Sequence, residues 1–102
     1  MTLKESVMLK WLDRQEKHHR ALQQHLSEKL FADGMLQVRN LITSRGWDAT
    51  YQYVLDWLDK TKSERTVGSH LLHVLYVQLK DKMTSLNSMD EIHLTRELAK
   101  LG

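Results

Sequence analysis

Cysteine and proline are both missing from the 102-residue chain, and glycine occurs only four times. The absence of cysteine excludes disulfides, zinc–thiolate sites and cysteine nucleophiles, and it fits a reducing compartment. The absence of proline, together with so few glycines, leaves few obligatory breaks and favours long helices. Alternating runs of β-branched or aromatic residues between turn residues are also missing, so we expect no strands.

Long apolar runs are equally scarce. No stretch approaches the roughly 18 residues of a membrane span. The first ten residues carry Lys4, Glu5 and Lys10 where a signal peptide needs an uninterrupted apolar region. We therefore expect a cytoplasmic protein with no membrane partner. Charged residues make up 27% of the chain and hydrophobic residues 41%, which is the composition of one globular domain over residues 1–102.

The chain does contain an apolar stretch from Thr66 to Met83. A helix over this stretch places most of its apolar side chains on an arc of roughly 200°: Val67, Leu71, Leu72, Val74, Leu75, Tyr76, Leu79 and Met83. A surface helix usually shows an apolar stripe of about 100°. Because the wider arc needs neighbours on two sides, the sequence predicts an all-α fold, a compact bundle of four or five helices around a central helix at about 66–83.

The first helix is expected to begin at Leu3, since Thr2 and Glu5 have the S/T-x-x-E spacing of a capping box. Its apolar positions continue to Leu30, which predicts a helix of about 28 residues, long for so small a domain. Polar residues interrupt the middle of its apolar seam. We therefore expect part of this helix to pack against another chain.

The apolar face changes near Leu30. The following apolar row projects roughly 160° away from the earlier face and comprises Phe31, Met35, Val38 and Ile42. The turn-prone pair Asp33-Gly34 favours a bend at this point; one helix that buries opposite sides at its two ends is the alternative. With the bend, a second helix spans about 34–44 and stops at Gly46.

The remaining elements are predicted from caps and connectors. Asp48 is expected to cap a third helix, with Trp47 before it as a staple residue. The polar run 59–65 is interpreted as a connector or a frayed helix end, and the segment 84–87 is interpreted as a second connector. Ser88 and Glu91 have capping-box spacing and are expected to open a last helix whose apolar positions are Met89, Ile92, Leu98 and Leu101.

Six histidines raise the question of a metal or a catalytic site. His70 and His73 have a spacing that can hold one ion, but no carboxylate stands at the next turn to complete a ligand set. Ser69 beside these histidines does not suggest a nucleophile with its base, because adjacent helical residues point about 100° apart and no third group is evident. No glycine-rich phosphate loop is present. We expect no cofactor, no metal and no enzymatic activity.

Three cations share one face of the first helix. Lys10, Arg14 and Lys17 stand at i, i+4 and i+7, and such a stripe can meet phosphates or an acidic protein surface. The alternative is a solvated helix face on which Lys17 pairs with Asp13.

The segment Ser63–Val67, followed by His70-Leu71 and Val74-Leu75, resembles the recognition-helix segment of LuxR-type helix-turn-helix regulators. The preceding helix departs from that family, which has small and apolar residues where this chain has Trp57 and Lys60. A recognition helix also presents polar and basic side chains to base edges, whereas this helix is among the most apolar in the chain. We assign no functional residue from the resemblance.

By elimination, the sequence favours a non-catalytic protein–protein interaction or regulatory module. We expect a homodimer through the first helix, because Trp11, His18, Leu22 and His25 lie along its seam and polar seam residues often fix oligomer state. The cationic stripe completes the predicted partner-binding surface. The alternative function is a small DNA-binding regulator that uses this stripe or the region of Lys60, Lys62 and Arg65.

Overall fold

The computed structural model describes the backbone of residues 2–21, 25–61 and 67–101 and the side chains of residues 2–17, 32–61 and 73–101. Within these residues it contains five helices. The helices are α1 (Leu3–Ala21), α2 (His25–Arg45), α3 (Trp47–Thr61), α4 (Val67–Asn87) and α5 (Glu91–Leu101). The described residues contain no strand. The all-α prediction is therefore confirmed.

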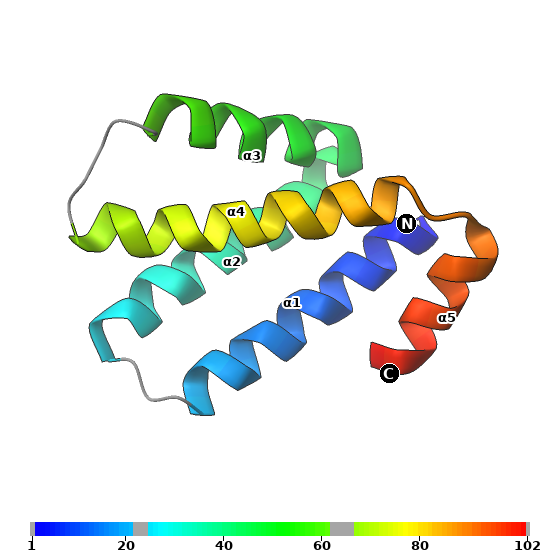
Figure 1. The fold of residues 1–102 in the computed structure, drawn as a ribbon, viewed down its shortest axis with the longest axis horizontal. Coiled ribbons are helices and arrows are strands. Elements are labelled where there is room, and N and C mark those ends of the chain that lie inside the picture. Colours follow the sequence, from blue (N-terminus) through cyan, green and yellow to red (C-terminus); the bar gives the residue numbers. More distant parts are fainter. Residues whose placement is uncertain (1, 22–24, 62–66, 102) are drawn as a thin grey trace.

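Helix α4 lies at the centre of the arrangement, as predicted. It packs against α1, α2 and α3, whereas α5 packs mainly against α1. Figure 1 shows α3 running antiparallel to α4 along one side, with α1 and α5 on the other side and α2 behind. The bundle measures 41 × 30 × 22 Å, with α5 at one end of its long axis.

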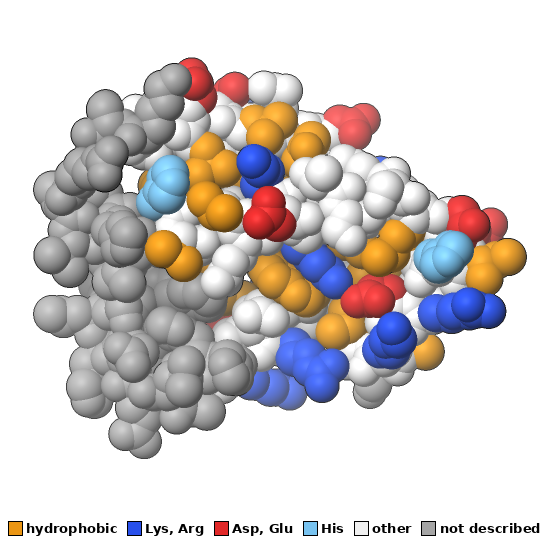
Figure 2. All heavy atoms as spheres, viewed as in Figure 1, with side chains coloured by type: hydrophobic (Ala, Val, Ile, Leu, Met, Phe, Trp, Pro, Cys, Tyr) orange, Lys and Arg blue, Asp and Glu red, His pale blue; other side chains and the backbone are white. Residues whose placement is uncertain are grey.

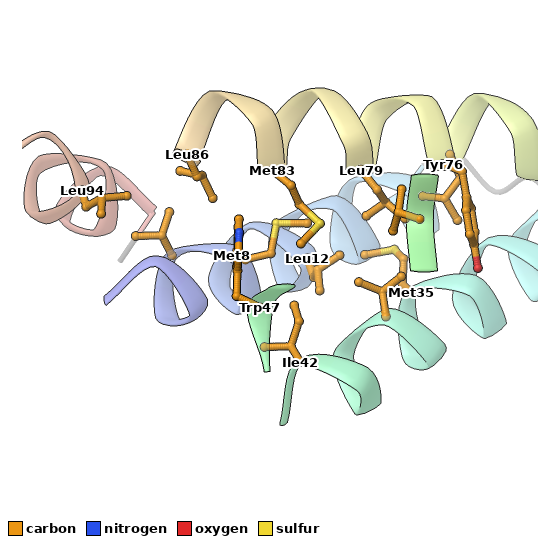
Figure 3. Close-up of a cluster of buried hydrophobic side chains, with 14 residues drawn as sticks. Met8, Leu12, Met35, Ile42, Trp47, Tyr76, Leu79, Met83, Leu86 and Leu94 are labelled. Atoms are coloured by element: carbon orange, nitrogen blue, oxygen red, sulfur yellow. The ribbon is translucent and has the colours of Figure 1, made fainter. Parts of the chain in front are cut away.

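The core lies between α4 and the helices α1 and α2. In Figure 3, Leu79 and Met83 point from α4 toward Met8 and Leu12 of α1 and Met35 of α2. The buried apolar side chains are Val7, Met8, Leu12, Met35, Val38, Ile42, Trp47, Val54, Leu75, Tyr76, Leu79, Met83, Leu86 and Leu94. The central row predicted on α4 is thus buried at Leu75 and Leu79, while the side chains of Val67, Leu71 and Leu72 lie outside the described residues.

The start of α1 confirms the predicted capping box. The Thr2 amide donates to Glu5 Oε1 over 2.8 Å, and the Glu5 amide donates to Thr2 Oγ1 over 3.2 Å. These two bonds satisfy amides that a helix start leaves without a partner inside the helix. The bond from the Thr2 amide also lowers the pKa of Glu5.

The predicted end of the first helix and the predicted bend were both wrong. Helix α1 ends at Ala21 and not near Leu30, and α2 begins at His25 and passes through Asp33-Gly34 without interruption. A turn-prone pair is only a weak preference, and tertiary packing often overrides it. Here the buried side chains of Met35, Val38 and Ile42 hold this segment as a helix against the core.

The predicted stop after Arg45 is confirmed. Gly46 has a φ of +86°, and its amide donates to the Ile42 carbonyl over 3.2 Å. This left-handed conformation is costly for residues that carry a Cβ, so glycine is the natural choice. Helix α3 begins directly afterwards at Trp47, so Asp48 lies inside its first turn and is not the cap we predicted.

Residues 84–87 are the last turn of α4 and not a connector. Leu86 is fully buried and extends the apolar row of Leu75, Leu79 and Met83 by one turn. Asn87 Oδ1 accepts hydrogen bonds from Trp47 Nε1 (2.8 Å) and Lys4 Nζ (2.9 Å). The end of α4 is therefore fixed to the starts of α1 and α3.

The apolar positions predicted for the last helix are confirmed at Met89, Leu98 and Leu101, which pack against the core, but the prediction was wrong at Ile92. Ile92 is 63% exposed, whereas Leu94 is only 8% exposed. The cap is Asp90 and not Ser88, because Asp90 Oδ1 accepts the His93 amide over 2.8 Å. Leu94, Leu98 and Leu101 form the inward i, i+4, i+7 row, and Ile92 points outward. Val74 of α4, placed by the sequence on the apolar arc, is exposed as well.

Candidate functional site

The cationic stripe predicted on the first helix lies on the surface of α1. Lys10, Arg14 and Lys17 are all exposed. Together with Lys100 of α5 they border a surface groove of about 460 Å³, which Asp13 and Leu101 also line. We call this site the basic groove. Figure 2 shows Lys and Arg side chains gathered over α1 and α5 on this face.

The groove exists because α5 docks on α1. Leu94 is buried, and Leu98 and Leu101 pack against the core beside it. At the α4 side, Lys82 Nζ donates to Glu97 Oε1 over 2.9 Å. This bond lowers the pKa of the Glu97 carboxyl, so the carboxylate stays ionised further into the acid range.

Arg14 connects the two walls of the groove. Its guanidinium donates to the backbone carbonyl of Lys100 over 3.3 Å. That carbonyl belongs to the last turn of α5, where helix carbonyls lack partners inside the helix and attract cations. The contact holds the Arg14 side chain across the groove while the other donors of its guanidinium stay available.

The carboxylate in the groove is already neutralised. Asp13 forms an ion pair with Arg39 of α2, and the Arg39 guanidinium also lies 4.0 Å from Glu16. The predicted partner of Asp13 was Lys17, so that pairing was wrong. Lys10 and Lys17 form no ion pair with any residue of the described part of the chain. The basic groove therefore keeps a local excess of positive charge.

The structure brings only some of the predicted partner-binding residues together. Lys10, Arg14 and Lys17 come together as expected. Trp11 is partly buried and packs against the core. The side chains of His18, Leu22 and His25 lie outside the described residues, so the seam that they were predicted to form is not described.

Sequence reasoning missed Lys100, Leu101 and Arg39. Lys100 and Leu101 reach the site only because α5 docks beside α1, and Arg39 reaches Asp13 from α2. The sequence contains one partial signal for this docking, the i, i+4, i+7 row of leucines that ends at Leu101. Nothing in the sequence indicates which helix that row packs against.

The fold gives little support to the other candidates, which are the helix-turn-helix, the region of Lys60 and a metal site. Helices α3 and α4 lie antiparallel along each other (Figure 1), and Trp57 stacks on Tyr76 with ring centroids 4.0 Å apart. A helix-turn-helix has two helices that cross at about 90–120°. Lys60 is exposed on α3, while Lys62 and Arg65 lie outside the described residues. In the part of the chain that the structure describes, no three His, Asp or Glu residues are grouped as metal ligands would be.

Comparison with other proteins adds no family: no protein family, curated protein or solved structure matches this chain. Within the described residues, every helix is too short or too polar to cross a membrane. The basic groove is therefore the candidate functional site.

Proposed function

We propose that this protein is a non-catalytic interaction module that binds an acidic segment of a partner protein in the basic groove. The observation that carries the proposal is the convergence of Lys10, Arg14 and Lys17 with Lys100, a cation from a different helix, around one groove. Complementary charge of this kind steers a partner and fixes its register.

The partner is proposed to be a protein because the positive region is short. Lys10 and Lys17 are seven residues apart, which is roughly 10 Å along a helix. Nucleic-acid binding usually needs a longer basic face, since affinity grows with the number of phosphates that are contacted. Four cations around a groove that also contains Leu101 suit a few carboxylates beside an apolar contact.

Arg14 favours carboxylates in particular. A guanidinium can form two parallel hydrogen bonds with a carboxylate, which a lysine ammonium cannot. Because the Lys100 carbonyl already holds Arg14 across the groove, less side-chain freedom is lost when a ligand binds.

The binding experiment compares two double variants that change the net charge equally. Lys10→Glu with Lys17→Glu reverses the groove, and Lys60→Glu with Lys80→Glu is the control on α3 and α4. The probes are a fluorescent glutamate-rich peptide and a DNA duplex of about 12 base pairs, measured by fluorescence polarisation at about 20 and about 200 mM NaCl. We expect the groove variant to bind the peptide roughly tenfold more weakly, a loss of about 1.4 kcal/mol, and the control to bind like the wild type.

Either of two results would contradict this function. The control variant could lose peptide affinity as strongly as the groove variant, which would mean that only net charge matters. The duplex could bind more tightly than the peptide at both salt concentrations, which would favour the DNA-binding alternative.

Self-association through α1 is a separate part of the proposal. Its basis is narrower than the sequence suggested, because α1 ends at Ala21 and Trp11 packs against the core. We expect sedimentation at about pH 8 to show a dimer at tens of micromolar. The dimer should loosen toward about pH 5.5, where histidines in a shared seam gain charge. A monomer at pH 8 would remove the dimer and leave the groove proposal unchanged.

A further inference from the structure

A second depression lies on the outer face of α5. It measures about 400 Å³ and is lined by Glu91, Ile92, Thr95 and Arg96. Ile92 is the most exposed of the large apolar side chains in the described residues. A single exposed isoleucine is ordinary on a protein surface, so its meaning depends on its neighbours.

Those neighbours connect Ile92 to the basic groove. Ile92, Arg96 and Lys100 stand at i, i+4 and i+8, so they follow one side of α5. Arg96 lines the Ile92 depression, and Lys100 lines the basic groove. At 1.5 Å per residue, the eight residues from Ile92 to Lys100 span about 12 Å. The two depressions thus lie along one side of α5, and each is bordered by a cation of that helix.

We propose that the occupant of this surface is an extended peptide segment that places its acidic residues in the basic groove and one large apolar side chain on Ile92. This inference rests on the function proposed above and specifies the partner. An extended chain advances about 3.3 Å per residue, so 12 Å corresponds to an apolar residue about four positions from the acidic cluster.

The direction of the segment follows from the charge at the far end. Glu91 is exposed beside Ile92 and would repel an acidic residue there. Arg96 and Lys100, toward the groove, would attract one. The acidic end of the segment therefore lies toward α1, and its apolar end lies over the first turn of α5.

A helical partner fits less well. A docked amphipathic helix needs an apolar groove that receives side chains at every turn. Ile92 is the only apolar residue among the four that line its depression. One apolar anchor beside a row of cations suits an extended segment.

The test uses three labelled peptides with the same glutamate cluster. The first has leucine four positions after the cluster, the second has serine there, and the third has leucine eight positions after it. Fluorescence polarisation compares their affinities for the wild type, for Ile92→Ser and for the control Val74→Ser, which removes an exposed apolar residue from α4. Serine and isoleucine have similar helix propensities, so the α5 change should leave the fold intact.

For the wild type and Val74→Ser, we expect the first peptide to bind roughly tenfold more tightly than the second. For Ile92→Ser, the two affinities should become equal. Equal affinities for the wild type would overturn the Ile92 contact while leaving acidic binding in the groove standing. If the third peptide bound most tightly, the proposal that the bound segment is extended would be overturned. If no peptide binds, the groove proposal fails as well.

Discussion

The helix pairs α3–α4 and α1–α5 are held together by different kinds of contact. In the α3–α4 pair, Trp57 stacks on Tyr76 and Tyr53 lies 6.3 Å from the same ring. Tyr76 is only 3% exposed, and burial raises its pKa. In the α1–α5 pair, leucines of α5 pack at the base and the Arg14–carbonyl bond joins the two helices at the surface, while the Lys82–Glu97 ion pair ties α5 to α4.

The difference shows which pair leaves charged side chains available at the surface. The aromatic rings of α3 and α4 pack directly against each other. The α1–α5 pair uses a narrow apolar base, so cations on both helices remain at the surface. Surface charges contribute little to stability, and they can therefore serve a partner without weakening the fold.

The largest expected effect concerns α4, the central helix, which packs against α3 and also against α1. Leu75→Ala should lower the free energy of unfolding by about 2–5 kcal/mol, because it removes a fully buried side chain from α4. Urea denaturation gives the value. The adjacent control Val74→Ala, at an exposed position, should change it by less than about 0.5 kcal/mol. Equal effects of the two changes would mean that the assigned face of α4 is wrong.

A smaller effect should show whether the α1–α5 pair opens independently of the α3–α4 pair. Leu94→Ala should cost about 2 kcal/mol, at the low end for a buried leucine because α5 lies at the edge of the bundle. Hydrogen exchange should show faster exchange for the amides of α5 than in the wild type, with those of α3 unchanged. Ile92→Ala is the matched control on the outer face of α5. Faster exchange throughout α3 would show that the α1–α5 pair is not an independent unit.

The smallest expected effect concerns the stability of the protein at low pH. The hydrogen bond from Lys82 lowers the pKa of Glu97 below its usual 4.5 in the folded protein. A lowered folded pKa gives stability that is present above pH 4.5 and is lost as the pH falls through the folded value. Glu97→Gln should therefore reduce the drop in the urea midpoint between about pH 5 and about pH 3. An unchanged pH profile would mean that this ion pair does not hold α5.

The fold was predictable wherever a local pattern had only one consistent interpretation. The Thr2–Glu5 capping box, the stop at Gly46 and the apolar row of α4 are such patterns. Errors arose at Asp33-Gly34 and at residues 84–87, where weak turn or polar signals competed with buried side chains. Packing decided in favour of the helix at both places, because burying Met35 and Leu86 outweighs small backbone preferences.

Less of the candidate site was predictable. The spacing of Lys10, Arg14 and Lys17 is visible in the sequence, because a helix fixes which residues share a face. The roles of Lys100 and Arg39 depend on which helices dock beside α1. The error at Ile92 has a different cause: Ile92 and Leu101 stand about 180° apart on one helix, and α5 buries the side that carries Leu94 and Leu101.

The double hydrogen bond at Asn87 has a consequence for the order in which the protein is assembled. Lys4 meets a partner 83 residues further along the chain, and Arg14 meets one 86 residues further along. A ribosome adding 5–20 residues per second takes roughly 4–17 s to cover the second interval. Throughout that time the buried side of α1 has no α5 to cover it. The basic groove can thus form only after α5 has been synthesised, and a chain interrupted before α5 would carry the lysines of α1 without the second wall of the groove.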